Sequence, residues 1–173
     1  MINTWLRENK IAAALLTVIR VYWGYLWITA GWGKITGGFD SKGFLANAAA
    51  NPVMGPDGAP VFGWYNSFLQ SFALPNADLF NFIIPWGEFL VGLGLILGCL
   101  TTAAAFFGIL MNFSFLLTGT VSHNPTDILM GVFILAAGYN AGRFGLDYYV
   151  MPFIRKQLNK GKEEESAANV NRV

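Results

Sequence analysis

The stretch TVIRVYWGYLWITAGWGK, from Thr17 to Lys34, sets the fold class of this chain. It forms most of an apolar run from Ile11 to Trp32, which is long enough to cross a membrane, because a helix needs roughly 20 apolar residues to span a hydrocarbon core of about 30 Å. Arg20 lies inside this run. A charged side chain near the centre of a bilayer costs about 3 kcal/mol on insertion scales, so Arg20 requires a partner or a wet cavity.

The composition of the whole chain is that of a membrane protein. Of its 173 residues, 54% are hydrophobic and 12% are charged, whereas roughly 25% are charged in a typical soluble domain. Three further apolar runs are long enough to be spans: Leu79–Gly98, Thr102–Thr120 and Ile128–Gly145. The sequence therefore predicts an all-α fold, an integral membrane four-helix bundle, with residues 1–152 as one four-span domain.

The distribution of Lys and Arg predicts the orientation of the chain. Four spans place both termini on one side, and only Lys34 and Lys42 fall on the other side. The terminal side carries Arg7, Lys10, Arg143, Arg155, Lys156, Lys160, Lys162 and Arg172. Because basic residues concentrate in cytoplasmic loops, we expect a cell-membrane protein with both termini cytoplasmic. Residues 153–173 form a charged cytoplasmic tail, which we expect to be disordered from Asn159 onward.

The first two spans are joined by a long outer loop, residues 35–78. Part of this loop has apolar residues at helical spacing: Val61, Tyr65, Phe68, Leu69 and Phe72. The pattern predicts a short amphipathic helix on the outer membrane surface. Such a helix is either an interfacial anchor or a lid over a pocket.

Small and polar residues lie along one face of each predicted span. On the first span this face consists of Arg20, Gly24, Trp27, Gly31 and Lys34. On the second span it consists of Asn81, Pro85, Glu88, Gly92 and Leu95. Glycines at this spacing let membrane helices pack closely, but packing does not explain Arg20 and Glu88. Each lies nine residues from the start of its predicted span, Arg20 after Ile11 and Glu88 after Leu79, so antiparallel helices would bring them to the same depth. We expect them to pair, near Asn112, in either a structural or a functional site.

Few residue types are available for metal or redox chemistry. His123 is the only histidine and Cys99 the only cysteine, and no metal-binding or nucleotide-binding motif occurs. No metal, haem, flavin or nucleotide cofactor is therefore expected. His123 lies in the short outer connection TGTVSHNPTD, where it is either a solvated loop residue or a proton relay at a cavity mouth.

Four segments together resemble the DoxX/DoxD-like family of four-span membrane proteins. They are IRVYWGYLWITAGWGKITGGFD, FNFIIPWGEFLVGLGLILG, FFGILMNFSFLLTGTVSHNP and ILAAGYNAGRFGLDYYVMP. The family includes the membrane subunit of thiosulfate:quinone oxidoreductase and members associated with oxidative stress, thiols and quinone detoxification. The resemblance implies that signature positions of the family are occupied here by Arg20, Gly24, Gly31, Lys34, Glu88 and Asn112.

The leading hypothesis is a redox-associated membrane subunit that binds a quinone as substrate, or a similar flat apolar ligand, in a polar cavity within the bundle. With a partner it would take part in thiosulfate, thiol or quinone oxidoreduction. Its candidate catalytic residues are Glu88, Arg20 and His123, and its candidate ligand-binding residues are Arg20, Lys34, Asn112, Trp27 and Trp86. The tryptophans would stack on the ring or serve only in packing. We expect contact with the lipid bilayer and either a second oxidoreductase subunit or a homodimer, and no nucleic-acid partner. The alternatives are a small carrier or channel for an anion or protons, and a non-enzymatic scaffold for an oxidoreductase.

Overall fold

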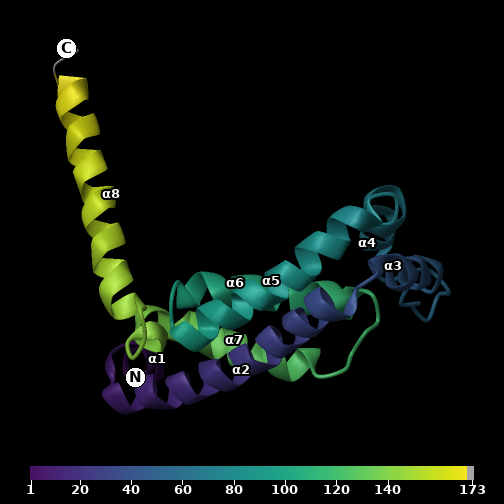
Figure 1. The fold of residues 1–173 in the computed structure, drawn as a ribbon, viewed down its shortest axis with the longest axis horizontal. Helices are drawn as coiled ribbons and strands as arrows, with labels where there is room; N and C mark the ends of the chain where they lie inside the picture. The colour runs from purple at the N-terminus through teal and green to yellow at the C-terminus, as the bar shows by residue number, and fades with distance from the viewer. Residues whose placement is uncertain (171–173) are drawn as a thin grey trace.

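The computed structural model describes the backbone of residues 1–170 and the side chains of residues 1–160. In this part of the chain the regular elements are all helices (Figure 1). In order they are α1 (Ile2–Glu8), α2 (Lys10–Gly37), α3 (Ser41–Ala50), α4 (Gly63–Phe68), the π-helix η1 (Leu69–Ala73), α5 (Ala77–Leu97), α6 (Thr101–Leu117), α7 (Asn124–Ala137), the 3-10 helix η2 (Gly138–Gly142) and α8 (Asp147–Val170).

Two helices, α2 and α5, are each long and apolar enough to cross a membrane. A third span results if α7, η2 and the described start of α8 count as one broken span, which is bent by 85°. The predicted span Thr102–Thr120 corresponds to α6, which is apolar but has only 17 residues. By length and composition the structure thus has two or three candidate spans.

The closest helix pair is α2 and α5, which run side by side (Figure 1). A Cβ atom on Gly31 would lie 2.5 Å from the backbone nitrogen of Phe89, and one on Gly92 would lie 2.4 Å from that of Ile28. Only glycine permits backbones to approach this closely. These contacts determine which residues of α5 lie opposite which residues of α2.

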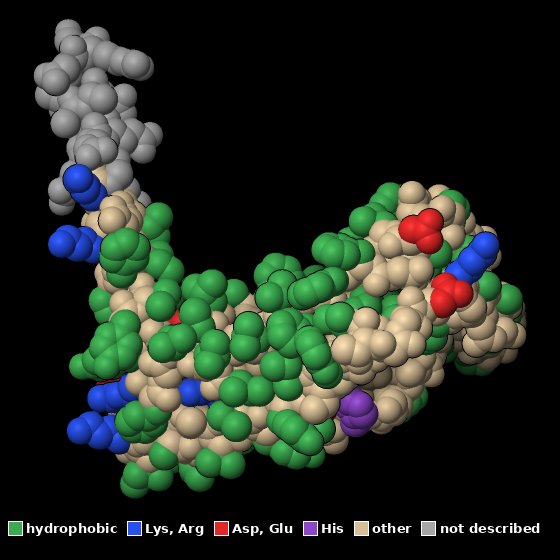
Figure 2. Space-filling model, viewed as in Figure 1, with side chains coloured by type: hydrophobic (Ala, Val, Ile, Leu, Met, Phe, Trp, Pro, Cys, Tyr) green, Lys and Arg blue, Asp and Glu red, His purple; other side chains and the backbone are tan. Residues whose placement is uncertain are grey.

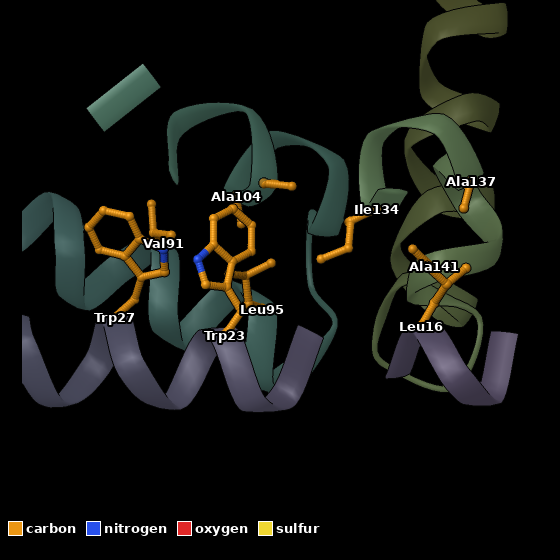
Figure 3. Packing of buried hydrophobic residues seen from close by; sticks show 10 residues of the cluster. Leu16, Trp23, Trp27, Val91, Leu95, Ala104, Ile134, Ala137 and Ala141 are labelled. Atoms are coloured by element: carbon orange, nitrogen blue, oxygen red, sulfur yellow. The ribbon is translucent and has the colours of Figure 1, made fainter. Parts of the chain in front are cut away.

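Trp23 and Trp27 extend from α2 into the core between the other helices (Figure 3). The rings of these two residues meet edge to face, with centroids 6.3 Å apart. Two glycines make room for Trp23: a Cβ on Gly108 would lie 3.0 Å, and one on Gly131 2.7 Å, from its ring. The glycines on the faces of α6 and α7 therefore accommodate an indole ring rather than a second backbone.

The loop between α2 and α5 folds into its own small apolar cluster. Leu45 and Ala49 of α3 pack there with Leu69 and Ala73 of η1. Ser41, at the start of α3, donates its backbone N–H to Asn81 Oδ1 at 2.7 Å and its hydroxyl to the carbonyl of Ala77. These bonds hold α3 against the first turns of α5.

The helix α8 leaves the rest of the protein at a steep angle (Figure 1). Its backbone is helical to Val170. The disorder expected from Asn159 onward stays a prediction. Residues 171–173 of the predicted tail lie outside the described residues.

We predict that Gly31→Ala lowers the free energy of unfolding by about 1–3 kcal/mol, because the added methyl group must push α5 away from α2. Gly33→Ala is the matched control on the same helix, since nothing lies within 4 Å of a Cβ at that position. Unfolding in mixed detergent micelles measures both variants. Equal stability of the two variants would contradict the backbone contact.

Candidate functional site

A cavity of about 340 Å³ lies at the end of the helices away from the chain termini. It is lined by α2, α5, α6, the connection before α7, the first turn of α7, and residues at and before the start of α3. The residues that line it are Leu26, Trp27, Ala30, Lys34, Phe39, Phe44, Ile84, Glu88, Asn112, Phe115, Thr120, Ser122, His123, Asn124 and Asp127. Eight of these fifteen residues are polar, and we call this site the polar cavity. It combines apolar walls with polar groups that converge from several segments, as small-molecule sites do.

An ion pair lies in the wall of this cavity. Lys34 Nζ lies 2.6 Å from Glu88 Oε2, and the Glu88 side chain is 3% exposed against 29% for Lys34. The buried carboxylate is held by a lysine that still reaches solvent. Because Lys34 has three N–H donors and the pair uses one of them, the ammonium can also donate to a ligand in the cavity.

Two buried hydrogen-bond donors of the cavity wall have no partner in the described structure. They are Asn112 Nδ2, on a residue that is 1% exposed, and Trp27 Nε1. A buried donor without a hydrogen bond costs about 1–3 kcal/mol, so such groups are rare unless a ligand or water satisfies them. Both residues line the same cavity, which therefore offers free donors to an acceptor-bearing molecule.

A second polar pair borders the same cavity. His123 Nδ1 lies 2.7 Å from Asp127 Oδ2, and the His123 side chain is 64% exposed (Figure 2). Asp127 is buried in the first turn of α7, where the helix dipole stabilises its negative charge. The pair joins solvent to the cavity.

Arg20 lies elsewhere, at the far end of the same helix. Its guanidinium group is buried and donates to four main-chain carbonyls: Leu95 at 2.5 Å, Ile96 at 2.8 Å, Phe144 at 3.0 Å and Ala141 at 3.1 Å. Two glycines, Gly98 and Gly145, leave the space that the guanidinium group fills. Arg20 therefore joins α2 to the end of α5, to η2 and to the segment between η2 and α8.

The expected Arg20–Glu88 pair is thus wrong, since each residue has other partners. The expectation counted both residues from the ends of the predicted spans. The glycine contacts instead place Gly31 opposite Phe89 and Gly24 opposite Gly92. In this register Glu88 faces the Lys34 end of α2, and Arg20 faces the last turn of α5, about 10 Å farther along that helix.

The structure brings together five of the predicted site residues and separates two. Around the cavity are Trp27, Lys34, Glu88, Asn112 and His123. Arg20 does not line it, and Trp86 lies outside it with 41% of its surface exposed. Asp127 was not among the predicted site residues, although its position four residues after His123 in the sequence was a usable signal. Within the described residues, no group of three or more His, Cys, Asp or Glu side chains could hold a metal ion.

Comparison with known proteins gives one match. The family model DoxX matches residues 15–120, which cover α2 to α6 and include Lys34, Glu88 and Asn112. Comparisons with curated proteins and with solved structures give no match.

We predict that Arg20→Ala lowers the free energy of unfolding by at least about 3 kcal/mol, because it leaves buried carbonyls without donors. Arg7→Ala is the control, since exposed Arg7 donates one hydrogen bond, to the carbonyl of Ala136. Its loss should cost about 1 kcal/mol or less. Denaturant unfolding in micelles compares the two variants, and similar losses would show that Arg20 is not the structural contact described here.

Proposed function

The chain belongs to the DoxX family, and we propose that it is a redox-associated membrane subunit that binds a quinone, or a similar ligand with carbonyl acceptors, in the cavity beside Lys34 and Glu88. The observation that carries this proposal is the pair of unpartnered buried donors, Asn112 Nδ2 and Trp27 Nε1, in the wall of that cavity. A planar molecule with carbonyl oxygens would satisfy both donors without bringing a charge into the apolar surroundings.

The polar groups of the cavity suit proton delivery to such a ligand. Reduction of a quinone to a quinol takes two electrons and two protons. Glu88 and Lys34 would hold protons at the buried wall, and the His123–Asp127 pair would exchange them with solvent. The two electrons would come from two thiols, oxidised to one disulfide, or from two thiosulfate ions, oxidised to one tetrathionate, on a partner subunit. This chain would supply binding, orientation and protons.

The proposal includes a membrane arrangement in which α2, α5, α6 and α7 all cross the bilayer as a four-helix bundle. The 17 residues of α6 extend about 26 Å, which is close to the hydrocarbon thickness. The placement of the basic residues supports cytoplasmic termini, since Lys and Arg side chains gather near the end that carries α1 and α8 (Figure 2). The cavity would then open to the outside, beneath α3, α4 and η1.

We predict that Asn112→Ala weakens binding of a quinone analogue about tenfold, the value of one buried hydrogen bond. Asn47→Ala, at an exposed position of α3, is the matched control and should bind normally. Quenching of tryptophan fluorescence by a soluble ubiquinone analogue measures the affinity, because Trp27 lines the cavity.

Glu88→Gln tests the second part of the proposal. This variant keeps the size of the side chain but removes its charge and its proton, so quinol formation with the donor and partner present should fall more than analogue binding does. If folded Asn112→Ala and Glu88→Gln proteins both behave as wild type, the function is not at this cavity. Anion or proton flux in vesicles without any redox donor would instead favour a carrier.

The orientation predicts the labelling of two introduced cysteines in a Cys99→Ser background. Asp57→Cys, in the exposed turn between α3 and α4, should react with a membrane-impermeant maleimide in intact cells. Gln157→Cys, exposed on α8, should react only after the membrane is permeabilised. The reverse pattern would mean that the termini lie outside.

A further inference from the structure

A second, apolar cavity of about 210 Å³ adjoins the first one. It lies between α5 and α6 on the inner side of α3, α4 and η1, and we call it the apolar slot. The two cavities share Phe44, Ile84 and Phe115, which thus form the wall between them. The rings of Phe44 and Phe115 meet edge to face with centroids 6.3 Å apart. The slot is therefore separated only by these side chains from the cavity that holds Lys34, Glu88 and Asn112.

The slot differs from the polar cavity in its hydrogen bonding. The hydroxyl groups that border it already donate to main-chain carbonyls: Tyr65 to Ser114 at 3.1 Å, Ser114 to Leu110 at 2.9 Å and Thr118 to Phe115 at 2.6 Å. Burial raises the pKa of the Tyr65 hydroxyl, which keeps it a neutral donor. The unpartnered donors Asn112 Nδ2 and Trp27 Nε1, in contrast, belong to residues that line the polar cavity. The slot thus presents apolar surface with its polar groups satisfied.

In the proposed membrane arrangement, the outer edge of the slot faces lipid. Ile83 of α5 and Leu110 of α6 line it and are 48% and 51% exposed on the flanks of the protein. Apolar side chains exposed on a spanning helix contact lipid. A molecule dissolved in the bilayer can thus reach the slot sideways between these two helices, without passing through water.

We propose that the ligand of the polar cavity is amphipathic, with its acceptor-bearing head beside Asn112 and Lys34 and a flexible apolar chain in the apolar slot. This inference rests on the proposed function and adds the class of ligand: a lipid-soluble molecule with a chain, not a small polar metabolite. An apolar cavity of about 150 Å³ is already large enough for benzene, so the slot accommodates part of such a chain. Each methylene group that it buries should tighten binding about fourfold.

The test compares two analogues with the same quinone head, one without a chain and one with a decyl chain, by quenching of tryptophan fluorescence. Wild type should bind the decyl analogue more than tenfold tighter. Ser114→Phe, which places a ring in the slot, should reduce this preference to threefold or less and leave the affinity for the chainless analogue unchanged. Ser71→Phe, the same change at an exposed position of η1 outside both cavities, should keep the full preference, and so controls for partition into the detergent.

The outcomes separate the two proposals. If wild type binds neither analogue, the proposed function fails and this inference fails with it. If both analogues bind and Ser114→Phe keeps the preference for the decyl chain, only the inference about the chain is overturned. The inference about the chain is also overturned if a phospholipid copurifies in the slot and the decyl analogue does not displace it.

If Ser114→Phe does not fold, a labelling experiment on wild type tests whether the apolar chain of the ligand lies in the slot. A decyl analogue with a photoreactive diazirine at the end of its chain should label residues 65–73 or 110–118, the segments of α4, η1 and α6 that border the slot. Labelling confined to the lipid-facing sides of other helices would overturn the inference.

Discussion

The burial of the Arg20 guanidinium group against four main-chain carbonyls is the constraint on which the rest of this structure depends. The last carbonyls of a helix have no partner within that helix, and they carry the negative end of its dipole. At the end of α5 the guanidinium group of Arg20, which belongs to α2, donates hydrogen bonds to these carbonyls. The same group binds the segment that leads into α8. A charge that is costly in a membrane thus joins three parts of the chain, and Gly98 and Gly145 keep the space for it.

This use of Arg20 determines the chemistry at the other end of α2. Because the Arg20 guanidinium group donates its hydrogen bonds to main-chain carbonyls, the charge of Glu88 is neutralised by Lys34. Lys34 lies 14 residues after Arg20 on α2. Lys34 is only partly buried and borders a cavity, whereas Arg20 is enclosed. One helix therefore carries a closed structural contact at one end and an open polar site at the other, and variants at the two ends are expected to affect different properties of the protein.

Much of the site follows from residue type and spacing. Arg20, Gly24, Trp27 and Gly31 are on the buried face of α2, and Pro85, Glu88 and Gly92 are on that of α5, as helical periodicity predicts. The grouping of Lys34, Glu88, Asn112 and His123 around one cavity agrees with their predicted place in one site. The pairing failed because equal distances from the starts of the two predicted spans were taken as equal depth, whereas α2 continues five residues beyond its predicted end at Trp32, to Gly37. The closest approach of α2 and α5 is set by glycines, and their positions were the better guide to the register.

The amino-acid sequence alone specified a helical membrane protein of the DoxX family, the faces of its helices and the side chains available for chemistry, because these depend on composition and on a period of 3.6 residues. Three-dimensional packing determined which groups these side chains contact. Arg20 binds carbonyls, Glu88 binds Lys34, and Asn112 and Trp27 keep free donors beside the apolar slot, because helix register and close glycine contacts join residues that no local pattern relates. A shift of α5 by a single turn, about 5.4 Å, would separate these partners without changing any helix.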